Sequence, residues 1–274
     1  MNALAKVFII LTCGLFLQSC GHTLIYDKDT LRSSHVSAAL PQGSIHTPTE
    51  DDTTQFRIQA AAAVSGQWPV TLSIATEPSW SLGWLDSTVI LKRARMSFPT
   101  WQGSASLAAI FQGKLRLGVG FDRSVNGLAK WGDAGFRWGK EWGAEWFVDL
   151  GTVPVRAEAH WISERIWKNY TGHDSSRQID TSLIGRSDRF FWRTGLHFAR
   201  RSGGPWLEGQ WTRISLFTSP STSVDFMGNV LSLGAGWTQP TRFGALVAYG
   251  RASVIGTTWL PPQVGLQWTG EMGL

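Results

Sequence analysis

From residue 55 to the end of the chain, segments of about ten residues alternate apolar and polar side chains, separated by clusters of Gly, Pro, Asn, Asp and Ser. A period of two is typical of strands that bury one face, and such clusters are typical of turns. In residues 114–122, the odd positions hold Leu, Leu, Val and Phe, whereas the even positions hold Lys, Arg, Gly and Asp. The sequence therefore predicts an all-β domain over residues 55–274.

Turn signals match these strands. Gln112-Gly113, Gly139-Lys140 and Gly151-Thr152 each predict a tight connection, and residues 201–205 predict a sharper break. One long polar segment, Asn169 to Asp188, is predicted to be an exposed loop. Short turns on one end and longer loops on the other are typical of outer-membrane barrels. Residues 55–274 leave room for an antiparallel up-and-down barrel of about 12 strands, with a range of roughly 10–14.

Alternation alone fits a soluble sandwich, a lipocalin-like cup or a membrane barrel. Only 16% of the residues are charged, whereas soluble domains carry about 25%. The polar face is rich in Gly and Ala with scattered charges of both signs, which suits a narrow lumen where side chains must fit and pair. We therefore predict a transmembrane barrel with its apolar face toward lipid. The predicted lumen charges are Arg116, Asp122, Arg137, Glu145, Asp149, Arg156, Glu158, Arg193 and Glu208.

All 16 Trp residues lie at or beyond Trp68. Indole rings favour the bilayer interface, where the ring is partly buried and its N–H stays hydrated. Trp146 and Trp211 fall in the middle of predicted strands and do not fit an interfacial girdle. The Trp residues near predicted strand ends are expected to form that girdle: Trp68, Trp101, Trp131, Trp161, Trp167, Trp206 and Trp259. The alternatives are core residues of a soluble β-protein or a platform for stacking sugar rings.

Residues 1–19 have the organisation of a secretory signal. A short positively charged start precedes an apolar run of 11 residues, residues 7–17, which is too short to span a bilayer. Leu17-Gln18-Ser19 then precedes Cys20, and this pattern resembles the lipobox of bacterial lipoproteins. The resemblance implies that Cys20 is lipidated and becomes the acylated mature N-terminus, and Gly21 after it implies sorting to the outer membrane. An ordinary signal peptide with an incidental cysteine is the alternative.

Residues 20–54 show no sustained period of 2 or 3.6 and contain two prolines and an acidic cluster at residues 50–52. A segment of this composition buries too little surface to become ordered, so we predict a flexible tether. A short helix or strand near Thr23–Tyr26 is an alternative for that part. Its three histidines, His22, His35 and His46, match no compact metal-ligand spacing. No metal or cofactor is expected, and the mature chain would have no free thiol.

Candidates for catalysis are Glu158, His160 and Ser163, because some outer-membrane barrels are lipid hydrolases that use a Ser, a His and an acid at the rim. Ser163 lies three residues beyond His160, so on a strand it points the other way unless a bulge intervenes. No nucleophile elbow, phosphate-binding loop, dinucleotide fingerprint or H-E-x-x-H motif occurs. We therefore expect a non-catalytic role that is structural, pore-like or a surface interaction. A lipid-tethered sandwich that binds glycans and a lipid hydrolase remain the alternatives.

The expected partner is outer-membrane lipid, including lipopolysaccharide. Basic residues at Lys92-Arg93 with Arg95, and at Arg200-Arg201, fit lipid phosphates or anionic headgroups. Export removes the opportunity to meet nucleic acid. Residues 263–268, which read Gln-Val-Gly-Leu-Gln-Trp, resemble the recognition strand that outer-membrane barrels carry at the C-terminus, although Gly270 stands where a second aromatic belongs. The expected location is the outer membrane of a Gram-negative-type bacterium.

Overall fold

The computed structural model describes residues 24–41, 54–68, 70–72, 85–91, 94–139, 141–168, 174–218 and 225–273. The described part contains 15 strands in one sheet. No helix among these residues is long and apolar enough to cross a membrane. Cys20, residues 1–19 and residues 42–53 lie outside the described residues.

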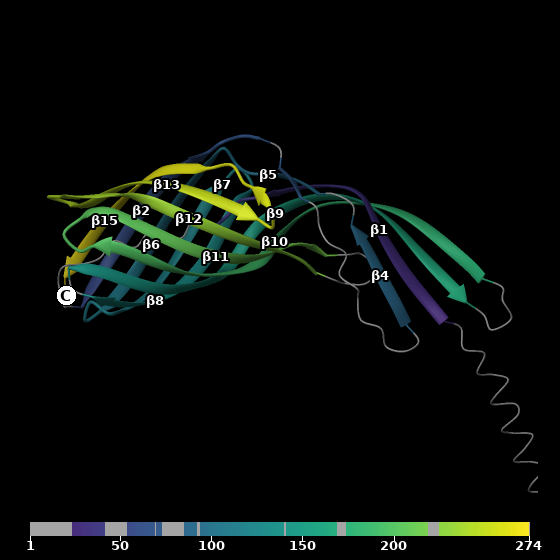
Figure 1. Ribbon diagram of the computed structural model, residues 1–274, viewed down its shortest axis with the longest axis horizontal. Helices are drawn as coiled ribbons and strands as arrows, with labels where there is room; N and C mark the ends of the chain where they lie inside the picture. The colour runs from purple at the N-terminus through teal and green to yellow at the C-terminus, as the bar shows by residue number, and fades with distance from the viewer. Residues whose placement is uncertain are drawn as a thin grey trace, which may run out of the picture.

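Ten of the strands form a closed antiparallel barrel (Figure 1). Each strand pairs with its neighbours in the ring, and the last strand pairs with the first to close it. The predicted fold class is confirmed, with ten strands in the ring instead of about 12. In chain order, the barrel strands are β2 (Gln55–Ser65), β6 (Trp101–Phe111), β7 (Leu115–Ser124), β8 (Gly127–Gly139), β9 (Trp142–Lys168), β10 (Asp174–Arg200), β11 (Gly204–Thr218), β12 (Asp225–Thr241), β13 (Gly244–Ile255) and β15 (Gln263–Gly273).

The two ends of the barrel carry different connections. One end, here called the short-turn end, holds the turns that follow β6, β8, β10 and β12, and Gln55 of β2 pairs there with Gly273 of β15. Gln112 and Gly113 are the central residues of a β-turn in which the Lys114 N–H donates to the Phe111 carbonyl, and their φ angles of 49° and 63° lie in the left-handed region that a type I′ turn requires. The opposite, long-loop end holds the longer connections. These include the remaining short strands β3 (Val70–Leu72), β4 (Leu85–Leu91), β5 (Ala94–Ser97) and β14 (Thr258–Trp259).

Strands β9 and β10 continue beyond the barrel as an arm. They pair with each other over 27 residues, whereas β8 pairs with β9 only as far as Thr152. Beyond that point β1 (Leu24–Ala38) pairs with β9 in place of β8, and β4 and β5 pair with β1 in parallel. The extension from Thr152 to Lys168 is roughly 50 Å long at about 3.3 Å per residue. In Figure 1 the arm curves away from the barrel axis.

The arm corrects two sequence predictions. Gly151-Thr152 is not a turn, because both residues lie inside β9. A Cβ atom on Gly151 would come within 2.1 Å of the Lys130 carbonyl oxygen, so glycine here allows β8 to approach. The predicted exposed loop from Asn169 to Asp188 is wrong from Asp174 onward, because those residues pair with β9. Residues 169–173 lie outside the described residues.

The predicted tether is also wrong in part. Residues 24–38 form β1, and residues 39–41 follow it as an irregular segment in which Ala39 is 2% exposed. The composition of this segment suggests disorder, but β9 supplies its backbone hydrogen-bond partners from more than 100 residues away in sequence. A local pattern cannot show such a partner, because the pairing depends on the tertiary fold.

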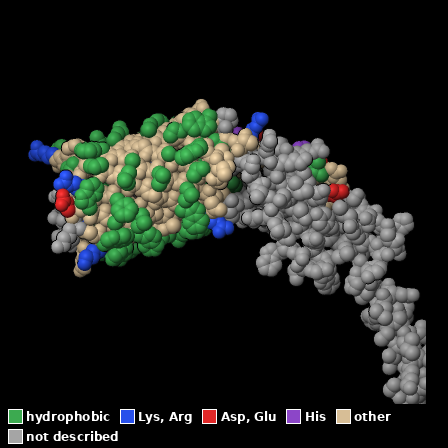
Figure 2. All heavy atoms as spheres, viewed as in Figure 1, with side chains coloured by type: hydrophobic (Ala, Val, Ile, Leu, Met, Phe, Trp, Pro, Cys, Tyr) green, Lys and Arg blue, Asp and Glu red, His purple; other side chains and the backbone are tan. Residues whose placement is uncertain are grey.

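Strand residues of the barrel direct their apolar side chains outward. In β7, the odd residues from Leu115 to Phe121 are 43–62% exposed, whereas Arg116 and Asp122 are each 1% exposed. Figure 2 shows hydrophobic side chains over the outside of the barrel, with Lys and Arg near its two ends. This arrangement is the reverse of a soluble β-protein, whose apolar face is buried. It fits the prediction that the apolar side of each strand faces outward.

Candidate functional site: the barrel lumen

The lumen is lined by ionised side chains of both signs. Among the described residues, the buried charged side chains of the barrel wall comprise five arginines and five acids, so their formal charges cancel. The arginines are Arg57, Arg116, Arg137, Arg193 and Arg251. The acids are Asp122, Asp133, Glu145, Asp149 and Glu208. A balanced lining produces no strong field for ions of one sign.

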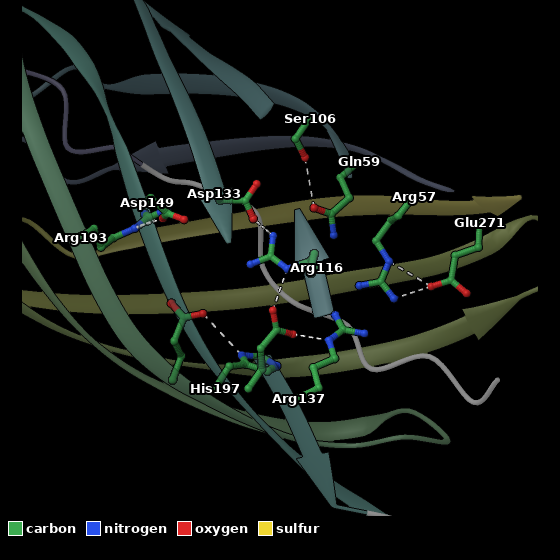
Figure 3. Close-up of polar contacts among 12 residues, drawn as sticks. Arg57, Gln59, Ser106, Arg116, Asp133, Arg137, Asp149, Arg193, His197 and Glu271 are labelled. Carbon is green, nitrogen blue, oxygen red and sulfur yellow. Dashed lines mark hydrogen bonds and ion pairs between the residues drawn. The ribbon is translucent and has the colours of Figure 1, made fainter. Parts of the chain in front are cut away.

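The largest group of contacts centres on Glu145 of β9. Figure 3 labels its two arginine partners, Arg116 and Arg137. Arg116 Nε donates to Glu145 Oε1 at 2.7 Å, and Arg137 Nε donates to Glu145 Oε2. A second nitrogen of Arg116 forms an ion pair with Asp133. One carboxylate therefore bridges two arginines, and one arginine bridges two carboxylates, across β7, β8 and β9.

Two like charges stand opposite each other in the ladder between β8 and β9. Asp133 and Asp149 are direct cross-strand partners, a placement that is destabilising unless each charge is compensated. Asp133 pairs with Arg116 on one side, and Asp149 pairs with Arg193 on the other, with Arg193 Nε at 2.6 Å from Asp149 Oδ2. The two arginines therefore neutralise a repulsion that the strand register creates.

Two further ion-pair sets complete the lining. Arg57 donates to Glu271 Oε1 from Nε at 3.0 Å and from a terminal nitrogen at 2.5 Å, which joins β2 to β15 near the short-turn end. Glu208 accepts from Arg251 at 3.0 Å, and its other oxygen lies 3.4 Å from His197 Nδ1. Removing one partner of such a buried pair typically costs about 3–5 kcal/mol, because the other charge stays buried.

Toward the long-loop end the lumen becomes apolar and is occupied by the chain's own N-terminal segment. Residues 36–41, here called the plug, place Val36, Ala38 and Ala39 in a buried apolar cluster with exposures of 0–2%. The cluster gathers inward side chains of six barrel strands around the plug. The wall residues in it include Trp131, Val153, Phe191, Ile214, Val230 and Ile255.

Polar wall residues hold the backbone of the plug. Gln102 Nε2 donates to the Leu40 carbonyl at 2.9 Å, and a terminal nitrogen of Arg193 donates to the Pro41 carbonyl at 2.8 Å. The hydroxyl of Ser37 also donates to Asn126 Oδ1 at 3.1 Å. Arg193 therefore contacts both the ionic lining, through Asp149, and the plug. Within the described residues, the plug fills this part of the lumen.

Most of the predicted lumen charges lie where the sequence placed them. Seven of them are buried in the lumen with exposures of 1–6%: Arg116, Asp122, Arg137, Glu145, Asp149, Arg193 and Glu208. The prediction is wrong for Arg156 and Glu158, because both residues lie on the arm. They pair with each other at 3.1 Å, and their side chains are 63% and 43% exposed. The period of two gives the face of a strand, but not where the strand leaves the barrel.

Of the predicted girdle residues, Trp68, Trp101 and Trp259 are 45–65% exposed at the long-loop end. The prediction of an interfacial position is wrong for Trp131, Trp161 and Trp206, because each side chain is at most 4% exposed. Trp131 packs beside the plug, Trp161 joins the same cluster from the middle of the arm, and the Trp206 ring centre lies 5.1 Å from that of His197. The side chain of Trp167 lies outside the described part of the structure.

Several outward aromatic residues near the short-turn end were not among the predicted girdle residues. They are Trp138, Trp142, Trp237, Phe243 and Trp268, all 41–77% exposed. Trp138 and Trp142 flank the turn between β8 and β9, and Phe243 lies in the turn between β12 and β13. Their closeness to short turns was a usable signal. With the three at the other end, they give the barrel an aromatic band near each end.

The candidate catalytic residues lie on the arm and are not brought together. His160 Nε2 pairs with Asp180 Oδ1, and Glu158 pairs with Arg156. The register between β9 and β10 is continuous, so Ser163 faces the side of the sheet opposite His160. The single irregularity in the β1–β9 ladder falls between Leu31 and Ser33 of β1 and does not redirect Ser163.

Several lumen residues were not singled out from the sequence. Arg57, Asp133, Arg251 and Gln102 all lie on inward faces of the barrel strands. Asp133 shares the odd-numbered face of β8 with Arg137, so the same period of two would have found it. Gln102 carries no charge, and its contact with the plug depends on a tertiary placement that no local pattern shows.

Comparison with known proteins adds little to this description. No family model matches the chain, and no curated protein matches it. Among solved structures, the crystal structure of the outer membrane protein OpdK from Pseudomonas aeruginosa matches at 13% identity with a TM-score of 0.21. The match covers 64% of this chain and 58% of that chain, which is less than two thirds of its length. A likeness at this TM-score carries no argument about function.

Proposed function

We propose that this chain is an outer-membrane β-barrel, anchored by a lipid on Cys20, with a closed lumen and a non-catalytic role in surface interaction. One observation carries the membrane placement: the apolar side chains of the barrel are exposed on the outside while ten charged residues are buried inside, counted over the described residues. Only a hydrocarbon surrounding makes that distribution favourable. The aromatic residues near both barrel ends support the same placement.

The closed lumen favours an interaction role over free diffusion of solutes. Charged side chains of adjacent and next-but-one wall strands pair with one another inside the barrel, and the plug packs against the wall at the long-loop end. The arm projects from that same end and exposes charged and apolar residues, among them Arg156, Ile184 and Phe190. Loops of outer-membrane barrels are longer on the outer side. The arm therefore offers the surface through which we expect a partner to bind.

The membrane placement is tested by a charge on the outer face. Val119 lies in the middle of β7 and is 62% exposed. Lysine at the midplane of a lipid-facing barrel wall costs about 2–4 kcal/mol, so Val119→Lys should lower the yield of barrel folded into liposomes. Val119→Thr is the uncharged control. Unboiled wild type should migrate faster than boiled sample in a detergent gel. A wild-type chain that stays monomeric in detergent-free buffer would overturn the proposal.

The anchor is tested separately. Cys20→Ala should remove labelling by a radioactive fatty acid while the barrel still requires detergent for extraction. Release of the Cys20→Ala protein into the aqueous fraction would show that the acyl chain alone holds it on the membrane. Unchanged labelling would overturn the assignment of Cys20 as the lipidated residue.

A second candidate function is a pore that opens when the plug leaves. The observation that favours it is the chemistry of the plug, which the wall holds by packing and a few hydrogen bonds without any ion pair among the described residues. Val36→Asp puts a carboxylate into the apolar cluster and should expel the plug. His35→Asp puts the same charge on the exposed neighbouring residue and serves as the control.

Conductance in planar bilayers separates the two functions. The closed-barrel proposal expects no channel steps from wild type or His35→Asp. Steps from Val36→Asp alone would support a pore with a removable plug. Silence from all three proteins would leave the interaction role and eliminate the pore, whereas steady steps from wild type would overturn the closed lumen.

A further inference from the structure

A cavity of about 700 Å³ opens at the short-turn end of the barrel, and its lining includes both outward residues such as Trp268 and buried residues such as Gln55 and Thr269. It lies where the turn between β10 and β11 meets the turn between β12 and β13, beside the end of β15. The two turns touch closely, since a Cβ atom on Gly203 would come within 2.6 Å of Pro240. In Figures 1 and 2 this is the end of the barrel at which the C-terminus lies.

One side of the cavity is cationic. Its lining includes Arg200, Arg201 and Arg242. Arg200 contacts Glu141 at 2.9 Å, and Arg201 donates to the Gly139 carbonyl at 2.8 Å, so both side chains are held in place. The guanidinium of Arg242 lies 5.8 Å from the centre of the Phe243 ring, and no carboxylate among the described residues forms an ion pair with it. The charge of Arg242 is therefore available to a ligand.

The acid that lines the cavity does not cancel this charge. Glu271 accepts two hydrogen bonds from Arg57, which is 1% exposed in the lumen. Glu141 pairs with Arg200, and Arg57 already compensates Glu271, so neither acid cancels the charge of Arg242. An anion is therefore the ligand that the polar side attracts.

The other side of the cavity is apolar and continuous with the outer surface of the barrel. Phe243 is 77% exposed, Met272 54%, and Ile58 and Trp268 41% each. A free phosphate would use only the arginines and leave these side chains uncovered. A phospholipid matches both sides, since its phosphate meets arginines and its acyl chain covers apolar side chains.

We propose that this cavity binds one phospholipid with an anionic headgroup, with its phosphate at Arg242 and the adjoining arginines and its acyl chain over Phe243, Trp268 and Met272. This inference rests on the proposed membrane placement. Short turns of outer-membrane barrels lie on the periplasmic side, so the lipid comes from the inner leaflet. The site would hold a lipid against the wall near the strand seam between β2 and β15.

The test uses the full chain, folded in detergent micelles, with phosphatidylglycerol and phosphatidylcholine as probes. Native mass spectrometry should show one retained phosphatidylglycerol and little phosphatidylcholine. Arg242→Gln should weaken phosphatidylglycerol retention about fivefold, the expected effect of one arginine near an anionic lipid. Arg123→Gln is the matched control, because Arg123 is an exposed arginine near the opposite end of the barrel on β7.

Two further arms separate a lipid from a bare anion. Phe243→Ser should reduce phosphatidylglycerol retention, and excess inorganic phosphate should not displace the lipid. Equal retention of both lipids, an unchanged Arg242→Gln variant, or complete displacement by phosphate would each overturn the proposal. Heat-dependent gel migration of the same samples reports barrel folding. A folded barrel without lipid preference contradicts this site alone, whereas a chain that does not fold in detergent contradicts the proposed membrane placement.

Discussion

The ionic part of the lumen and its apolar part at the long-loop end are held together in different ways. In the ionic part, side chains of the wall strands pair with one another, as Glu145 does with Arg116 and Arg137. In the apolar part, the wall packs against residues 36–41, which belong to no barrel strand. The ion pairs of the wall cannot be broken without leaving charges buried and unpaired. The contacts of the plug can be broken by withdrawing one segment, so the two regions should respond differently to mutation.

Arg193→Ala should have the largest effect, because Arg193 joins the two regions. Its loss leaves the carboxylate of Asp149 buried opposite Asp133 and removes the hydrogen bond to the Pro41 carbonyl. We expect a loss of about 3–5 kcal/mol in the free energy of unfolding. Urea unfolding in detergent measures it. A loss below about 1 kcal/mol would show that water already solvates Asp149.

Ala38→Phe should have an intermediate effect that is confined to the apolar part. Ala38 is 0% exposed in the plug, and a larger side chain there costs about 1–3 kcal/mol through overpacking. We expect a lower free energy of unfolding together with easier proteolysis of the N-terminal segment. Val247→Ala, at a buried residue of the separate lumen cluster, is the control and should leave proteolysis of that segment unchanged. Equal proteolysis of both variants would contradict a separable plug.

Ile214→Val should have a smaller effect in the same part of the lumen. Ile214 is 1% exposed and packs in the cluster around the plug, so the loss of one methylene group should cost about 0.5–1.5 kcal/mol. Thermal unfolding followed by Trp fluorescence measures it. No change in the midpoint would mean that this part of the lumen is loosely packed.

His160→Ala should have the smallest effect. His160 pairs with Asp180 on the arm, where their side chains are 35% and 58% exposed, and surface substitutions typically change stability by less than about 0.5 kcal/mol. Membrane lipid profiles of cells that make this variant should equal those of wild type. An altered profile of lipid A or phospholipid would revive the hydrolase alternative and contradict a non-catalytic role.

The period of two in the sequence was sufficient to assign most of the lumen. It placed Arg116, Asp122 and Glu145 inside, because a barrel wall repeats one inward and one outward residue regardless of the partner strand. It failed for Arg156 and Glu158, because the same period continues where β9 leaves the barrel, and the face that carries these two residues is exposed there. It also failed for β1, whose backbone pairs with β9, a strand that lies far away in the sequence.

The orientation of the tryptophan side chains was the second feature that the sequence did not predict correctly. A large ring near a strand end fits both a membrane interface and the inside of a barrel, and the difference depends on the parity of its position in the strand. Trp101 is outward, whereas Trp131 and Trp206 are inward and fill the lumen. The plug could not be predicted, because residues 36–41 carry no motif and pack in a cluster built from six different wall strands.

The seam between β2 and β15 has a consequence for biogenesis. The ring is sealed by its first and last strands, with Gln55 beside Gly273, so the cylinder stays open until β15 has been made and has paired with β2. Residues 36–41 precede every barrel strand in the chain, so they are already present as a core when the wall strands assemble around them and β15 pairs with β2.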